Sequence, residues 1–217
     1  KEGKCGISTL EFFPTKYSST LPFAEIKIEN EKLKEKLKVK DAGVTRTTLL
    51  ALHAFEEAIN DSRLDKNKIS SYETALIGAN TVGGMCLTDE LYRDANSTAV
   101  SSEFISSYDA GSVNIFLQKR FEINGIINTI NTASSSSANA VMFGARLIKN
   151  GFAKRAIVGG VDSLSKFTIN GFNALHILSN EKCKPFDKNR NGLNLGEGAA
   201  FLVLEKAWQL QDKRLVD

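Results

Sequence analysis

A run of serines beginning at Ser134 lies where a β-type apolar segment meets a helical pattern; residues 131–138 read Asn-Thr-Ala-Ser-Ser-Ser-Ser-Ala. A side chain in a sharp strand-to-helix turn lies near the unpaired N–H groups and the positive dipole end of the helix, which stabilise a negative charge. For a thiol, such a place lowers the pKa enough to give a thiolate near neutrality, whereas for a hydroxyl the same shift is too small. We therefore single out Ser134 as the candidate catalytic residue.

Two local elements must position this turn. Residues 126–132 are rich in β-branched side chains and are expected to form a strand. Residues 134–150 are expected to be helical, with Val141, Ala145 and Ile148 on one face, and Gly151 is placed to end that helix. The pattern predicts a strand, a turn and a helix in direct succession.

The rest of the chain repeats this alternation. Further buried strands are expected at residues 74–78, 156–160 and 199–205, and an amphipathic helix at residues 45–60 with Thr45 or Thr47 as its cap. A short surface helix is expected to begin near residues 89–93, and residues 101–118 are expected to mix helix and loop. Alternating strands and helices predict an α/β fold whose sheet is mostly parallel.

Composition argues against several classes of protein. The 217 residues are 42% hydrophobic and carry a net charge of +3 from 28 basic and 25 acidic side chains, which are scattered along the chain. Scattered cations do not favour nucleic-acid binding. The three cysteines lie far apart and contain no Cys-x-x-Cys pair, so we expect no metal site and a reducing cytoplasmic location. The apolar runs are far shorter than the ~20 residues needed to span a bilayer, so we expect no membrane segment.

The same residues allow other interpretations. Serine at a helix start is most often a capping residue, and a serine hydrolase would need Gly-x-Ser-x-Gly, which the flanks Thr132 and Ser136 do not supply. The glycine pairs at residues 159–160 and 196–198 match no phosphate-binding loop, so close packing is expected there. His53 is expected at the edge of the core, and not as a base.

Several segments, in this order along the chain, resemble the β-ketoacyl-acyl-carrier-protein synthases, which are thiolase-like condensing enzymes. The turn at residues 132–136 is similar to that family's Thr-Ala-Cys-x-Ser, with Ser134 in the place of the nucleophilic cysteine. The other similar blocks are residues 82–85 (Val-Gly-Gly-Met), 144–151, 158–162 (Val-Gly-Gly-Val-Asp), 171–179 and 184–199, and more loosely residues 4–8.

The resemblance implies a layered α-β-α fold with helices on both faces of a mixed, mostly parallel sheet. It implies that Ser134 occupies the catalytic position, that Val82 and Phe172 line the acyl pocket, and that Arg46 and His176 lie near a basic patch that meets acyl carrier protein. The family condenses acyl and malonyl thioesters in fatty-acid or polyketide-type synthesis. No cofactor is implied, because the phosphopantetheine thioester enters on the carrier protein.

The resemblance also sets expectations for organisation and partners. Residues 1–217 are expected to form one amino-terminal synthase domain, cut short at its start and without the carboxy-terminal half that carries two histidines and a lysine. A homodimer, or a heterodimer with another synthase subunit, is expected. Serine at position 134 is either an exchange that traps substrate or a natural loss of the nucleophile. Three functions stay open: condensation, a non-catalytic partner like a chain-length factor, and malonyl decarboxylation alone.

Overall fold

The computed structural model describes residues 4–97 and 102–206. Four strands form its sheet: β1 (Thr74–Ala79), β2 (Ile127–Ile130), β3 (Arg155–Asp162) and β4 (Gly198–Glu205). The helices and 3-10 turns are α1 (Asn30–Leu37), α2 (Arg46–Ser62), α3 (Lys66–Ser70), η1 (Gly83–Leu87), α4 (Thr88–Ser97), η2 (Ile105–Ser107), α5 (Ser112–Phe121), α6 (Ser136–Lys149) and α7 (Lys166–Ala174).

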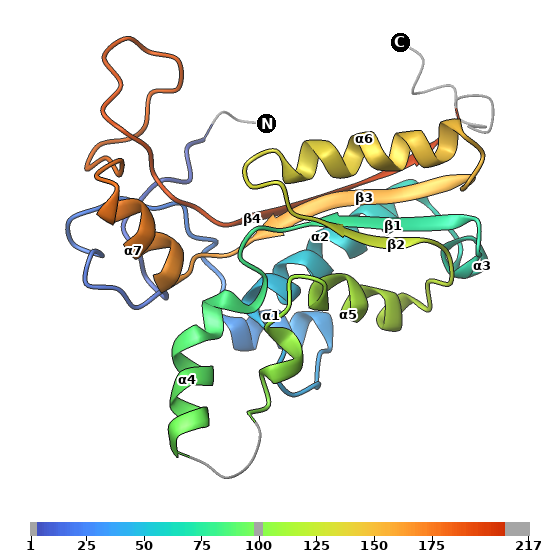
Figure 1. Ribbon diagram of the computed structural model, residues 1–217, viewed down its shortest axis with the longest axis horizontal. Helices are drawn as coiled ribbons and strands as arrows, with labels where there is room; N and C mark the ends of the chain where they lie inside the picture. Colours follow the sequence, from blue (N-terminus) through green and yellow to red (C-terminus); the bar gives the residue numbers. More distant parts are fainter. Residues whose placement is uncertain (1–3, 98–101, 207–217) are drawn as a thin grey trace.

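The strands lie in the order β2-β1-β3-β4 (Figure 1). β1 pairs in parallel with both β2 and β3, and β4 runs antiparallel to β3. Parallel neighbours end at the same edge of a sheet, so the loops that follow β1, β2 and β3 leave from one edge. This mixed, mostly parallel sheet is the one that the sequence predicted.

Helices cover both faces of the sheet. On one face lies α6, where Ala140 and Leu147 pack against Ala75, Ile77 and Val158 of the strands. On the other lie α1, α2 and α5 (Figure 1), with Leu52 and Phe55 of α2 packed among Leu76, Ile157 and Phe201. β3 is buried from both sides, which explains its nearly continuous apolar run. The expected layered α-β-α architecture is confirmed.

A capping hydrogen bond fixes the start of α2, and positive backbone φ angles fix the start and the end of α6. The Thr45 hydroxyl accepts a bond of 3.1 Å from the Thr48 N–H and caps α2, as the sequence predicted. The helix predicted from residue 134 begins instead at Ser136, because Ala133 adopts a positive φ of 53° and turns the chain before the helix starts. Gly151 follows α6 with φ 79°, in agreement with its predicted place.

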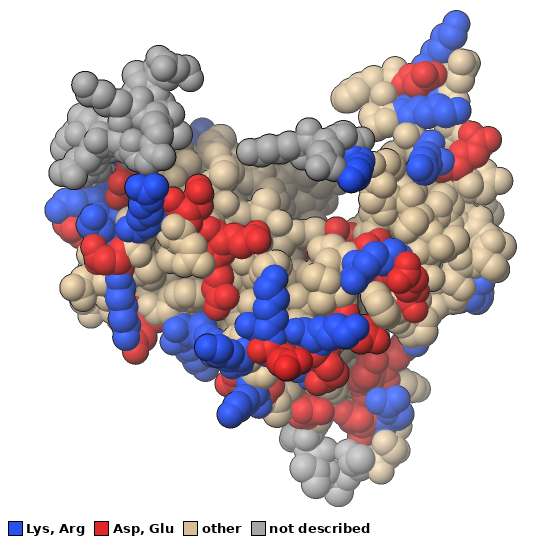
Figure 2. Space-filling view, turned by 180° about the vertical axis from the view of Figure 1, so that it is seen from behind, with Lys and Arg blue, Asp and Glu red and all other residues tan. Residues whose placement is uncertain are grey.

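The surface carries both signs of charge. Figure 2 shows Lys and Arg side chains interleaved with Asp and Glu side chains on one face of the molecule. None of the helices in the described ranges has the length and apolar character that crossing a bilayer requires.

Candidate functional site

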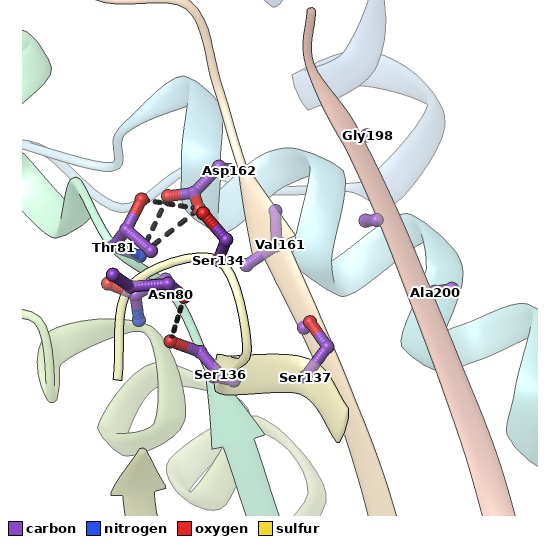
Figure 3. Close-up of a pocket in the computed structure, with 13 residues that line it drawn as sticks. Asn80, Thr81, Ser134, Ser136, Ser137, Val161, Asp162, Gly198 and Ala200 are labelled. Atoms are coloured by element: carbon purple, nitrogen blue, oxygen red, sulfur yellow. Dashed lines mark hydrogen bonds between the residues drawn. The ribbon is translucent and has the colours of Figure 1, made fainter. Parts of the chain in front are cut away.

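A pocket of about 520 Å³ opens at the edge where the parallel strands end. Its walls come from the ends of β1 and β3, the turn before α6 and the start of β4 (Figure 3). The lining residues are Ala79, Asn80, Thr81, Ala133, Ser134, Ser136, Ser137, Gly160, Val161, Asp162, Gly198, Ala199 and Ala200. Four segments far apart in the sequence therefore build one cavity, and Ser134 borders it.

Ser134 lies in a turn that its neighbours hold closed. The Ser136 hydroxyl accepts a bond of 2.8 Å from the Thr132 N–H and donates one of 2.6 Å to the Ala133 carbonyl. Ala133 adopts the left-handed conformation, which is strained for a residue with a β-carbon. The turn leaves Ser134 exposed, two residues before α6 begins. Its hydroxyl forms no hydrogen bond with any described residue, so it is available to a ligand.

Asp162, at the end of β3, fixes the opposite wall. Its Oδ1 accepts bonds of 2.9 Å from the Thr81 and Val82 N–H groups, and its Oδ2 accepts a bond of 2.7 Å from the Thr81 hydroxyl. In Figure 3, Ser134 lies beside Thr81 and Asp162. The carboxylate thereby fastens the chain that leaves β1 to the end of β3, next to the candidate nucleophile.

A glycine and a buried amide form part of the pocket wall. A β-carbon built on Gly160 would lie 2.1 Å from the Ser137 Oγ, so glycine permits the start of α6 to approach β3. Asn80 is only 3% exposed and donates from Nδ2 to the Ala110 carbonyl at 2.8 Å. Its Oδ1 is buried without a partner among the described residues.

The two residues predicted to contact an acyl chain lie outside this lining. Val82 is buried directly after Thr81, and Phe172 is partly buried on α7. Neither is among the residues that line the pocket at Ser134. Their contact with substrate stays a prediction.

Arg46, predicted to meet the carrier protein, has an internal role. Its guanidinium forms a buried ion pair with Glu197, with Nε to Oε2 at 2.9 Å and the two side chains 14% and 1% exposed. Its remaining N–H groups bind the carbonyls of Ile26 and Ile28 and the side chain of Asn30. All five donors are used, so this placement does not favour the predicted carrier contact.

The histidines lie away from the pocket. His176 lies just after α7 with a positive φ of 54°. Its side chain is exposed and therefore accessible to a partner, and its contact with the carrier protein stays a prediction. His53 lies on α2 with Nε2 3.8 Å from a Glu57 carboxylate oxygen. Neither histidine lines the pocket, and the part of this chain that the structure describes supplies no imidazole base to Ser134.

No group of three or more His, Cys, Asp or Glu side chains in the described ranges has an arrangement that could hold a metal ion. Cys86 lies in η1, beside the hydroxyl groups of Thr47 and Ser163, whose Oγ1 and Oγ atoms are 2.7 Å apart. Burial raises the pKa of the Cys86 thiol, and hydrogen bonds with the Thr47 and Ser163 hydroxyls oppose that rise without cancelling it. Cys86 is therefore a poor nucleophile.

Sequence reasoning missed most of the pocket wall. Asn80, Thr81 and Ser137 were not singled out, and Asp162 was noted only within the Gly-Gly-Val-Asp block. A signal was available, because side chains that directly follow parallel strands converge at one edge of the sheet. Reading two residues past the predicted strands at 74–78 and 156–160 would have found Asn80 and Asp162.

The structure is a three-layer α-β-α domain with Ser134 in the turn between β2 and α6, on the border of the pocket. The family model for the β-ketoacyl synthase N-terminal domain matches residues 23–209. The chain therefore belongs to the β-ketoacyl synthase family, as its N-terminal domain.

Individual proteins agree with this assignment. The chain is 30% identical to a putative mitochondrial 3-oxoacyl-[acyl-carrier-protein] synthase of Schizosaccharomyces pombe, over 94% of this chain and 52% of the relative. Its fold matches the ishigamide ketosynthase/chain length factor with a TM-score of 0.82 and 21% identity, over 95% of this chain and 52% of the other. A ketosynthase in complex with its chain length factor from Xenorhabdus doucetiae gives 0.71 and 26%, over 92% and 49%. The chain spans about half the length of these relatives.

Proposed function

We propose that the protein containing this domain is a 3-oxoacyl-[acyl-carrier-protein] synthase that condenses acyl and malonyl thioesters, with Ser134 in the nucleophile position. The observation that carries the proposal is the position of Ser134, at a strand-to-helix turn on the border of a pocket formed by the ends of parallel strands. Membership of the family supports the reaction class.

The proposed chemistry has two half-reactions. The side chain at position 134 attacks the thioester carbonyl of an acyl carrier protein, and the carrier thiol leaves with a proton. A malonyl thioester then loses carbon dioxide, and the resulting carbanion attacks the acyl group and frees residue 134. Backbone N–H groups of the turn before α6, including that of Ser134, are suited to stabilise the oxyanion in both steps. The bases lie outside the described part of this chain.

The proposal is tested with S134C in the full-length gene product. Acetyl, hexanoyl or dodecanoyl carrier protein is supplied with malonyl carrier protein, and β-ketoacyl products are measured by mass spectrometry. We expect S134C to form product and to be alkylated at position 134 by a cerulenin-like epoxide, since a thiol in this turn is activated and a hydroxyl is not. S134A is the matched control and should do neither. A folded S134C variant that gives no product and no alkylation would refute the proposal.

A second candidate is a non-catalytic subunit that pairs with an active synthase, as a chain length factor does. It is favoured by the serine itself, because a hydroxyl without a hydrogen-bonded base in the described chain is a weak nucleophile. Two of the structural neighbours are also ketosynthases with chain length factors. In this case S134C stays inactive alone, and the native protein raises or redirects the activity of a co-expressed synthase.

The proposed partners follow from the same family assignment. We expect acyl carrier protein to deliver the substrate, and a second synthase subunit to pair with this one. β2 is an edge strand with parallel hydrogen bonds on its β1 side, so its other side can accept a further strand. Size-exclusion chromatography with light scattering on the full-length protein tests the dimer, and a monomer would contradict it.

A further inference from the structure

The side chain of Glu197 joins β3 and β4 at the edge of the sheet where the pocket opens. The pair of residues nearest that edge is Asp162 of β3 and Gly198 of β4, and both line the pocket. Glu197 lies directly before Gly198, and its Oε2 accepts a bond of 3.3 Å from the Leu164 N–H, two residues past Asp162. The carboxylate therefore connects the two strands beyond their last backbone pair.

The Arg46 guanidinium holds this carboxylate in one orientation. Its Nε lies 2.9 Å from Glu197 Oε2 and its Nη2 donates to Oε1, while Nη1 and Nη2 also bind the carbonyls of Ile28 and Ile26. The Ile26 N–H donates to Glu197 Oε1 at 3.0 Å. The Glu197 side chain is only 1% exposed. A planar fork with its donors engaged fixes the direction of a carboxylate as well as balancing its charge.

A change in the orientation of Glu197 would reach the pocket from two sides. Gly198 is its covalent neighbour, and Asp162 is held through the end of β3. Asp162 in turn accepts a bond of 2.9 Å from the Thr81 N–H, and in Figure 3 Ser134 lies beside both of these residues. A displacement of about 1 Å in the groups around a reacting atom is enough to lower a rate about a hundredfold.

We propose that Arg46 and Glu197 are positioning residues for the reaction at position 134, because the fork geometry of the pair sets the pocket wall formed by the ends of β3 and β4. This inference rests on the proposed function for the reaction that the wall serves. Buried ion pairs are weak evidence for stability, and in some proteins they select one conformation instead. A charge in the right place but without the fork would then leave the wall poorly positioned.

A second buried pair on the same two strands supplies the matched control. Arg155 begins β3 and Glu205 ends β4, so this pair lies at the edge of the sheet opposite the pocket. The Arg155 Nε donates to Glu205 Oε1 at 2.7 Å, and the side chains are 11% and 18% exposed. Lysine in place of arginine keeps the charge but loses the planar fork of donors. R46K and R155K therefore make the same change at opposite ends of one pair of strands.

The first measurement is amide hydrogen exchange in the full-length protein, resolved to single residues by mass spectrometry with fragmentation. It follows the N–H groups of Thr81 and Val82, which donate to Asp162, and that of Leu164, which donates to Glu197. We expect R46K to speed their exchange on the order of tenfold and R155K to leave it unchanged.

Unchanged exchange of these amides in folded R46K, or an equal acceleration in R155K, overturns the inference. If R46K does not fold, N30A decides, because it removes a partner of Arg46 Nη1 at an exposed position. N30A should speed exchange of the same amides about twofold, and no acceleration in N30A would then count against the inference in the same way.

The second measurement is condensation by the same variants in the S134C background, with rates expressed per folded enzyme. We expect R46K to lower kcat on the order of tenfold and to leave KM for the acyl carrier protein within about twofold, because the buried pair presents no charge to a carrier. R155K should keep both values. Accelerated exchange with an unchanged kcat in R46K also overturns the inference. If S134C itself forms no product, the proposed function fails, while the exchange rates still test the geometry.

Discussion

Gly144 of α6 lies so close to Val158 of β3 that a β-carbon built on the glycine would stand 2.4 Å from Val158 Cγ1. Carbon atoms do not approach so closely, so the absence of a side chain at Gly144 sets the distance between α6 and the sheet. The same helix presents the turn that contains Ser134. The packing of Gly144 in the interior of α6 therefore governs the position of the pocket at the amino-terminal end of that helix.

The substitution G144A should destabilise the fold by about 1–3 kcal/mol, because the added methyl overpacks the interface between α6 and β3. Its matched control is G171A in the interior of α7, where no heavy atom of the described residues outside the local helix backbone lies within 4 Å of the added carbon. That substitution should be neutral or stabilise by up to about 1 kcal/mol through helix propensity. Urea unfolding measures both, and equal effects would contradict the packing explanation.

The buried Arg46–Glu197 pair should be costly to break. E197Q or R46M leaves an uncompensated charge beside the start of β4, and we expect a loss of about 3–5 kcal/mol in the free energy of unfolding. The control is E73Q, which breaks the exposed pair of Glu73 with Lys154 at 2.7 Å and should cost less than about 1 kcal/mol. Comparable losses in the two denaturant titrations would show that Arg46 has no special structural role.

The free energy of unfolding should depend on the ionised Glu25 carboxylate at neutral pH. Burial raises the pKa of this carboxyl, but hydrogen bonds from the Glu11 N–H, the Lys27 ammonium and the N–H groups of Phe13 and Phe12 outweigh that effect and leave the pKa below its ordinary 4.5. A group with a lowered folded-state pKa contributes stability above its unfolded pKa and loses it as the pH falls through the folded value.

We therefore expect E25Q to be less stable than the native protein by about 1–3 kcal/mol at neutral pH, because Gln cannot accept the same charge-assisted bonds. The difference should shrink as the pH falls from 4.5 and vanish below the lowered folded-state pKa of Glu25. Thermal melts across this range measure it, with the exposed Glu31 changed to Gln as the control. A constant difference across the whole range would exclude the carboxylate as its source.

Cys86 should resist thiol reagents because burial raises its pKa. Cys5 is exposed, so its labelling by iodoacetamide should be faster than that of Cys86 by on the order of tenfold or more. Peptide mapping over time gives both rates in one sample, and C86S confirms the assignment. Rapid labelling of Cys86 in the folded protein would show that its thiol is open to solvent.

The sequence predicted those strands and helices that a short run of neighbouring residues is enough to identify. The β-branched run of β2 and the apolar run of β3 identified strands at the right places, and the helical spacing of Leu49, Leu52 and Phe55 identified α2. The position of Ser134 at the end of a strand followed from the same local pattern. The helices α1, α3 and α7 were not predicted, because each is short and has few buried residues.

Relationships across long separations could not be predicted from a local pattern. Arg46 and Glu197 are 151 residues apart, and spacing alone gives no reason to pair them, so Arg46 was assigned to a surface role. The start of α6 was placed too early because propensity does not reveal the positive φ of Ala133. Val82 and Phe172 were placed by analogy of sequence, and their distance from the pocket depends on tertiary packing.

Gly198 lies at the pocket wall, and apart from its chain neighbours no described residue has a heavy atom within 4 Å of where a side chain would begin. A single codon change there can add bulk to the cavity while the backbone pairing of Gly198 with Asp162 continues behind it. Natural drift or laboratory selection can therefore reduce the pocket volume available to a ligand in small steps, while the rest of the fold is kept.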